Sequence, residues 1–225
     1  MNKWIRRKRN SHGYGVQSPN DFYFVQHVLR EEMFYYGYDE LLQAEGKFPT
    51  TLPRYGMPIN RLLFRLANYV HPQQMIEVGT GNGLATYAMA LAVPSGRCVT
   101  IDGSHQQTEE VAAALASLGQ VIVQNGDEMA LFSQLMQQVD VVELLHVAHT
   151  SYYREVVEMA LPRVTDRSLF IIEDIDADAD KRAWWKSMQE SQLTGVSYDV
   201  GSVGLLFFDK TRYKDMYWVS LKRHG

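Results

Sequence analysis

Short apolar runs alternate with segments of helical spacing through the middle of the chain. The runs are four to seven residues long, the usual length of a buried strand, and we predict strands at residues 75–78, 97–101, 120–124, 139–145 and 168–172. Apolar positions three and four residues apart predict helices at residues 58–70, 109–118, 127–137 and 151–161, and another directly after Leu84. Such alternation implies right-handed crossovers and a parallel sheet with helices on both faces.

The carboxyl-terminal part departs from this alternation. Residues 196–200 and 204–208 are β-rich and are separated by Gly-Ser-Val, which predicts an antiparallel hairpin. Aspartates occupy every second position from Asp174 to Asp180. A calcium loop of this kind would need glycine at its sixth place and glutamate at its twelfth, so we interpret the run as a solvated loop. The tail beyond residue 210 yields no prediction.

Three alternate glycines follow the first predicted strand. Residues 75–84 read Met-Ile-Glu-Val-Gly-Thr-Gly-Asn-Gly-Leu, with Gly79, Gly81 and Gly83 leading into a helix. Glycine lets the backbone turn sharply and lets a ligand approach it, and the new helix N-terminus offers N–H donors. A dinucleotide fingerprint requires glycine at the sixth place counted from Gly79, where this chain has Leu84.

Acidic residues follow the next two strands. Asp102 ends the second strand, about 20 positions after the glycine turn, where a carboxylate suits the hydroxyls of a ribose. The alternative for Asp102 is a helix N-cap or an ordinary loop residue. Gly126 and Asp127 follow the third strand, and Asp127 also suits the N-cap of the next helix.

The pattern Glu-x-Gly-x-Gly-x-Gly resembles motif I of the class I S-adenosylmethionine-dependent methyltransferases. That resemblance implies an α/β, Rossmann-like, doubly wound sheet, mostly parallel with a C-terminal antiparallel hairpin, and S-adenosyl-L-methionine as cofactor. In the family, the place of Gly126 and Asp127 borders the adenine. The cofactor-binding residues implied are Glu77, Gly79, Thr80, Gly81, Asn82, Gly83, Asp102, Gly126 and Asp127.

The amino-terminal region is rich in aromatic residues. Residues 13–56 hold ten of the chain's aromatics, so this segment must pack on something. Residues 11–22 resemble the opening of a bacterial, Bacteroidetes-type branch of these methyltransferases, His-Gly-x-Gly-x-His-Ser-Pro-Phe, with Gln17 and Asn20 as departures. The resemblance implies an N-terminal helical cap, residues 1–56, on a methyltransferase domain, residues 57–225. An aromatic helix that covers one sheet face is the alternative.

Catalytic candidates follow the fourth and fifth strands. Catechol-type O-methyltransferase relatives hold a divalent metal with an aspartate after strand four and an acidic pair after strand five. This chain keeps Glu173 and Asp174 but has no aspartate within residues 144–149. We therefore predict no metal, although His146 with that acidic pair would suit zinc or iron. We predict His149 as general base and Asp174 as a polar group of the pocket, with helix capping as the alternative for His149.

Composition limits the partners. The net charge of −4 argues against nucleic acid, and no apolar run is long enough to span a membrane. The single cysteine, Cys98, precludes an intrachain disulfide and favours a cytoplasmic location, and no signal peptide is visible. The basic run from Lys3 to Arg9 is interpreted as a solvated end. A homodimer is left open.

Three functions remain. The first is a bacterial methyltransferase that transfers a methyl group to a small-molecule acceptor, at oxygen. The second is a relative that binds S-adenosylmethionine without turnover, as a sensor or partner protein. The third, a nucleotide-sugar or nicotinamide enzyme, is disfavoured by the absent sixth glycine and by the hairpin.

Overall fold

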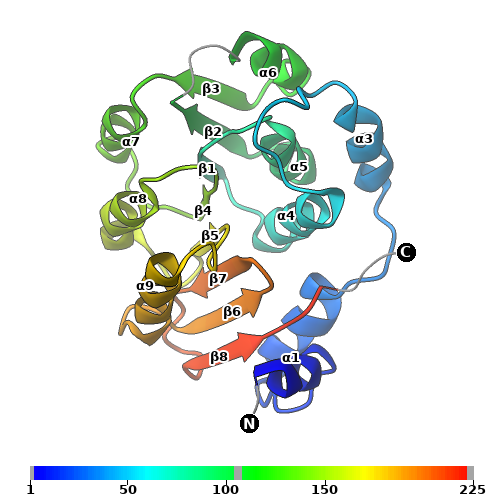
Figure 1. Cartoon of the computed structure of the whole chain (residues 1–225), viewed down its shortest axis with the longest axis vertical. Helices are drawn as coiled ribbons and strands as arrows, with labels where there is room; N and C mark the ends of the chain where they lie inside the picture. Colours follow the sequence, from blue (N-terminus) through cyan, green and yellow to red (C-terminus); the bar gives the residue numbers. More distant parts are fainter. Residues whose placement is uncertain (1–2, 104–107, 222–225) are drawn as a thin grey trace. The chain divides into compact units, whose positions relative to one another are not determined.

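The computed structural model describes residues 3–103 and 108–221, which form two compact units. One unit, here called the central unit, comprises residues 34–164. The other, the terminal unit, combines residues 1–33 with residues 165–225 (Figure 1). The predicted division into residues 1–56 and 57–225 stays a prediction.

The central unit is built on four parallel strands in the order β3-β2-β1-β4. The strands are β1 (Gln74–Val78), β2 (Arg97–Asp102), β3 (Val121–Asn125) and β4 (Leu144–Val147). The helices are α3 (Tyr36–Glu45), α4 (Met57–Val70), α5 (Leu84–Ala92), α6 (Thr108–Leu115), α7 (Glu128–Met136) and α8 (Tyr153–Ala160), followed by the 3-10 turn η2 (Leu161–Arg163). Figure 1 shows α4 and α5 on one face and α7 and α8 on the other.

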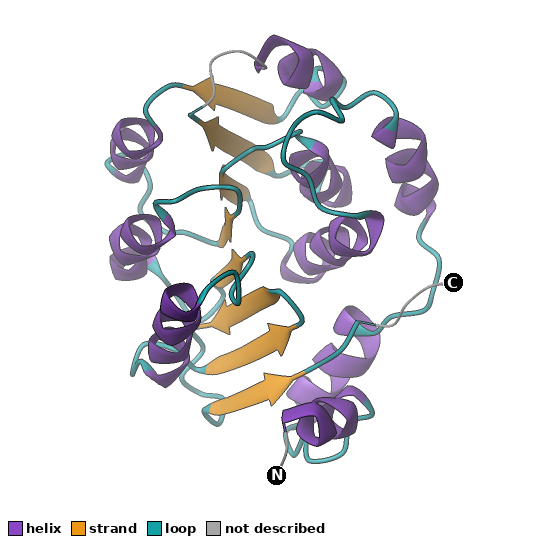
Figure 2. Cartoon of the chain, viewed as in Figure 1, coloured by secondary structure: helices purple, strands orange, loops and turns teal. Residues whose placement is uncertain are grey.

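The terminal unit has strands β5 (Leu169–Ile172), β6 (Val196–Val200), β7 (Val203–Phe207) and β8 (Asp215–Trp218), in the order β5-β7-β6-β8. β7 is antiparallel to both β5 and β6, whereas β8 is parallel to β6. Its helices are α1 (Lys3–Ser11), α2 (Pro19–Phe24), the π-helical η1 (Val25–Leu29) and α9 (Ala179–Glu190) (Figure 2). The predicted hairpin and the predicted Rossmann-like, mostly parallel fold class are both confirmed.

The prediction for the amino terminus is wrong. The basic amino-terminal run is not a solvated end, because it forms α1, whose Arg7 pairs with the buried Asp199 and whose Arg6 lies over the Trp218 ring. The tail beyond residue 210, for which no prediction was made, adds β8 to the sheet. Both elements depend on contacts between distant parts of the sequence, which local patterns do not show.

The fourth strand begins later than predicted. Val139 and Val142 are buried, yet β4 starts only at Leu144. The backbone here is satisfied by η2, because Val142 N–H donates to the Arg163 carbonyl at 3.0 Å and Arg163 Nε donates to the Val139 carbonyl at 3.0 Å. A buried apolar run therefore need not be part of the hydrogen-bonded ladder.

The aspartate run is divided between an exposed turn and a helix. Asp176 is exposed, in agreement with a solvated loop. Asp178 is the N-cap of α9 and accepts a hydrogen bond from Lys181 N–H at 2.7 Å, and Asp180 lies in the first helical turn. Carboxylates at these places complement the helix N-terminus, which explains their spacing without a metal.

Aromatic residues of the amino-terminal region pack on the sheet of the terminal unit. In the terminal unit, Phe24 packs on Tyr198 and Phe207 with ring centroids 4.8 and 5.1 Å apart, so α2 covers the sheet as the alternative interpretation expected. Ser18 is the N-cap of α2, and its hydroxyl oxygen accepts Asp21 N–H at 3.3 Å. Within the described residues, no helix combines the length and apolar character needed to cross a membrane.

Cys98 is predicted to be unreactive in the folded protein. Burial raises the pKa of its thiol well above the usual value, and the Glu77 carboxylate raises this pKa further. Because the thiolate is the reactive species, we expect negligible labelling by a thiol reagent at pH 8 in the native protein. Denaturation should release one reactive thiol per chain, as measured with Ellman's reagent. Rapid stoichiometric labelling of the native protein would contradict this burial.

Candidate cofactor site

The three glycines after β1 adopt backbone conformations that other residues rarely adopt. Their φ angles are +92° at Gly79, +55° at Gly81 and +88° at Gly83. A Cβ on Gly79 would lie 2.3 Å from the carbonyl oxygen of Ala148. A Cβ on Gly81 would lie 2.5 Å from both the Pro53 carbonyl oxygen and the His149 ring. The predicted requirement for glycine is therefore met by close packing as well as by backbone conformation.

Hydrogen bonds hold this glycine loop, residues 79–83, in place. Gly79 N–H donates to the Ile101 carbonyl at 2.8 Å, and Gly83 N–H donates to the Thr80 carbonyl at 3.0 Å. The Asn82 side chain accepts the N–H of Leu84, the first residue of α5, at 3.1 Å. The N–H groups of Gly79, Gly83 and Leu84 are thus already bonded within the protein. All five loop residues are buried, and the three glycines let neighbouring segments pack directly on the loop backbone.

Asp102 ends β2 beside the glycine loop, as predicted. Its Oδ2 accepts the Gly81 N–H at 3.0 Å, and its backbone carbonyl accepts Gly126 N–H at 3.0 Å. The side chain is half-buried, so the carboxylate combines a loop contact with access to solvent. Asp102 therefore lies at the junction of the ends of β1, β2 and β3, where ligands bind in parallel sheets.

Asp127 is the N-cap of α7, which confirms that part of its prediction. Its Oδ1 accepts Ala130 N–H at 2.8 Å. Gly126 precedes it and, with Asp127, lines a cavity of about 470 Å³. The capping bond uses Oδ1 of Asp127. The role predicted for Asp127 at the cofactor is compatible with this bond and stays a prediction.

Glu77 is fully buried, and its carboxylate is bonded to neighbouring strands and to α5. Oε2 accepts hydrogen bonds from the hydroxyls of Thr86 and Thr100, the latter at 2.6 Å. Oε1 lies 2.9 Å from Nδ1 of His146. These contacts compensate the cost of burying a carboxylate and fix the ends of β1, β2 and β4. Glu77 thereby stabilises the strand ends that carry the glycine loop. Its predicted contact with the cofactor stays a prediction.

Thr80 extends this buried network to the loop itself. Its hydroxyl lies 2.6 Å from the hydroxyl of Thr100, and both side chains are buried. His146, which the sequence analysis considered as an alternative metal ligand, is also fully buried, and its ring pairs with the Glu77 carboxylate. Within residues 3–103 and 108–221, no three His, Cys, Asp or Glu side chains are grouped so as to hold a metal ion.

His149 lies above the glycine loop. Its ring stacks on Tyr55 with centroids 4.4 Å apart and an interplanar angle of 15°, and it approaches Gly81 closely. His149 also lines the 470 Å³ cavity. The structure thus brings the predicted base to the predicted cofactor loop within the central unit. Asp174 belongs to the terminal unit, where it follows β5 in a left-handed conformation with φ +53°, and its role stays a prediction.

Two groups at this site were not predicted from the sequence. Glu128 accepts the Thr150 hydroxyl at 2.5 Å and Gly103 N–H at 3.2 Å, so it ties the ends of β2 and β4 together. The segment before α4 lies against the glycine loop, because the Pro53 carbonyl accepts Asn82 N–H at 2.9 Å. The cavity wall is completed by Gly103, Gly126, Asp127, Glu128, His149, Thr150, Ser151 and Tyr152.

Solved structures with the same fold are methyltransferases. The O-methyltransferase TomG of Streptomyces achromogenes, involved in tomaymycin synthesis and crystallised with S-adenosylmethionine, is 19% identical, with a TM-score of 0.60 over 92% of this chain and 99% of its own. An O-methyltransferase of Bacillus cereus in complex with S-adenosylhomocysteine is 17% identical, with a TM-score of 0.60 over 82% and 95% of the two chains. A Geobacter sulfurreducens methyltransferase is 22% identical, with a TM-score of 0.56 over 76% and 86%.

These similarities establish the fold. The Streptomyces achromogenes and Bacillus cereus proteins are O-methyltransferases crystallised with S-adenosylmethionine and S-adenosylhomocysteine, which agrees with the resemblance carried by the glycine motif. No known family description and no curated protein matches the sequence. The Bacteroidetes-type branch suggested by residues 11–22 stays a prediction.

Proposed function

We propose that this protein is an S-adenosylmethionine-dependent methyltransferase that methylates an oxygen of a small molecule. The observation that carries the proposal is the Asp102 carboxylate, bonded to Gly81 N–H at 3.0 Å beside three left-handed glycines. The proposal assigns this carboxylate as the acceptor for the ribose hydroxyls, beside the glycine loop. Neighbours with the same fold are crystallised with S-adenosylmethionine or S-adenosylhomocysteine, which supports the cofactor.

The residues of the central unit fit this cofactor. A carboxylate has several acceptor lone pairs, so the proposal assigns Asp102 to the ribose hydroxyls in addition to its bond with Gly81 N–H. The glycine loop allows the amino-acid part of the cofactor to lie directly on the backbone. Gly126 and Asp127 line the neighbouring cavity, where the adenine would contact backbone as well as the Asp127 side chain.

When bound, the cofactor supplies an electrophilic methyl group on a sulfonium. An acceptor hydroxyl must lose its proton as the methyl group is transferred, and His149 is the proposed general base. Tyr55 fixes the plane of the His149 ring by stacking, which orients the imidazole nitrogens above the glycine loop. Asp174 is proposed as a second polar group that positions the acceptor.

A comparison of two adenosine-containing ligands tests the cofactor class. S-adenosylhomocysteine should raise the melting temperature of the protein, since a ligand at a hundred times its Kd stabilises the folded state by about 2.7 kcal/mol. NAD at the same concentration should leave the melting temperature unchanged, because the loop has Leu84 where the dinucleotide motif has glycine. Stabilisation by NAD, or by neither compound, would contradict the proposal.

A further inference from the structure

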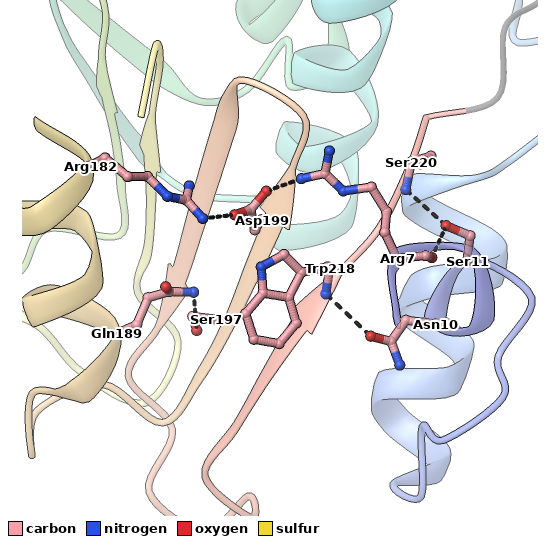
Figure 3. Close-up of polar contacts among 9 residues, drawn as sticks. All are labelled: Arg7, Asn10, Ser11, Arg182, Gln189, Ser197, Asp199, Trp218 and Ser220. Atoms are coloured by element: carbon pink, nitrogen blue, oxygen red, sulfur yellow. Dashed lines mark hydrogen bonds and ion pairs between the residues drawn. The ribbon is translucent and has the colours of Figure 1, made fainter. Parts of the chain in front are cut away.

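A second cavity lies wholly within the terminal unit. Strand alternation places Ser197 and Asp199 of β6 on the same sheet face as Met216 and Trp218 of β8, since these residues are paired across the two parallel strands. Helix α9 covers this face, and Gln189 Nε2 donates to the Ser197 hydroxyl at 3.2 Å. Figure 3 shows these polar contacts together with the helix α1 that flanks β8.

The cavity exists because α9 presents small side chains here. Ala179 and Ala183 lie one turn apart on the helix and leave space above Met216 and Trp218. The volume is about 690 Å³, which is within the range of pockets for small organic ligands. Met216 and Trp218 therefore give the cavity an apolar, partly aromatic floor, whereas charged side chains line its edge.

Positive charge predominates around this cavity. Arg6, Arg182 and Lys186 line it, whereas Glu190 is the one acidic residue among the described lining residues. Lys186 and Glu190 are exposed and lie 3.7 Å apart, so their pairing is weak. The two arginines are held more firmly, because Arg6 lies 4.1 Å from the centroid of the Trp218 ring and donates to the Met216 carbonyl at 3.3 Å.

The buried Asp199 carboxylate holds Arg182 in place without neutralising the positive charge beside the cavity. Asp199 is fully buried and binds Arg7 through Oδ1 and Arg182 through Oδ2, the latter at 2.5 Å (Figure 3). One carboxylate thus serves two guanidinium groups, which leaves an excess positive charge beside the cavity. Among the described residues, Arg182 Nη1 and Trp218 Nε1 have no hydrogen-bond acceptor although both atoms are buried. The Arg182 side chain as a whole is 28% exposed, so this arginine is partly accessible to a ligand.

We propose that this cavity binds a small organic carboxylate with a flat apolar or aromatic body. The body lies on Trp218 and Met216 beneath the alanines of α9, and the carboxylate faces Arg6, Arg182 and Lys186. A guanidinium offers a carboxylate both charge and paired N–H donors, and an indole ring offers a flat apolar surface. The site shares no residue with the glycine-loop site, so this proposal is independent of the methyltransferase assignment.

Fluorine NMR of the full chain labelled with 5-fluorotryptophan tests the proposal. The chain has four tryptophans, and Trp218→Phe assigns one resonance by its loss. Titration with 1-naphthoate should shift the Trp218 resonance, whereas the neutral analogue 1-naphthalenemethanol should bind at least tenfold more weakly. Inorganic phosphate, which lacks the apolar body, should also bind at least tenfold more weakly than naphthoate.

Charge variants complete the test. Arg6→Gln combined with Lys186→Gln should weaken naphthoate binding about tenfold, whereas the exposed control Arg167→Gln should change it less than twofold. Both substitutions spare the buried Asp199 pairs, so the unit should still fold. An unmoved Trp218 resonance at millimolar naphthoate would overturn the proposal. Equal binding of the neutral analogue or of phosphate, or full binding by the charge variant, would overturn it too.

Discussion

Gly79→Ala should abolish measurable binding of S-adenosylhomocysteine and lower the free energy of unfolding by about 2–4 kcal/mol. The φ angle of +92° is strained for alanine, and the added Cβ would lie 2.3 Å from the Ala148 carbonyl oxygen. The contact is with backbone, so relief requires the ends of β1 and β4 to move apart. Urea unfolding and calorimetry with S-adenosylhomocysteine measure the two effects.

Gly119→Ala is the matched control within the central unit. No atom lies within 4 Å of a Cβ built on Gly119, so the substitution should change neither unfolding nor binding appreciably. If Gly79→Ala behaves like this control, the description of the glycine loop is wrong. If Gly79→Ala unfolds the protein completely, Gly81→Ala provides a second test and should also weaken binding, because its Cβ would lie 2.5 Å from the His149 ring and from the Pro53 carbonyl oxygen.

Asp102→Ala should weaken binding of S-adenosylhomocysteine tenfold or more. Hydrogen bonds to a charged group contribute about 1.5–3 kcal/mol, and the ribose would lose two of them. The variant also loses the Gly81 N–H bond, so the loop should become less fixed. Calorimetry measures the affinity, and urea unfolding shows how much of the loss comes from stability.

Asp140→Ala is a suitable control because this aspartate is exposed and lies in the same unit. Its binding of S-adenosylhomocysteine should match that of the unsubstituted protein within twofold. Asp102→Asn should retain an acceptor for Gly81 N–H and bind with intermediate affinity, since the amide lacks the charge. Equal affinity of Asp102→Ala and the unsubstituted protein would show that Asp102 does not bind the ribose.

Local sequence signals predicted the parts of the site that depend on backbone geometry. The glycine loop, the acid ending β2 and the N-cap at Asp127 were all identified, because each has a local requirement for one residue type. The parallel strands were predicted from short apolar runs, since buried strands need little polar alternation. The hairpin of β6 and β7 was predicted from its β-rich runs and glycine turn.

The rest depends on contacts between distant residues. Nothing near Arg7 in the sequence indicates that it meets Asp199, and β8 is recognisable only through its pairing with β6. At the site, Glu128 lies in the first turn of α7, where an acidic residue is common and gives no functional signal. Its bonds to Thr150 and Gly103 join segments that are distant in sequence. The stacking of Tyr55 on His149 likewise joins residues far apart in sequence.

The most direct measurement is a crystal structure of the protein grown with S-adenosylhomocysteine. We expect the ribose hydroxyls within hydrogen-bond distance of the Asp102 carboxylate and the amino-acid part of the ligand against the backbone of Gly79 and Gly81. Density for the ligand elsewhere in well-ordered crystals, or contacts that omit both Asp102 and the glycine loop, would contradict the account.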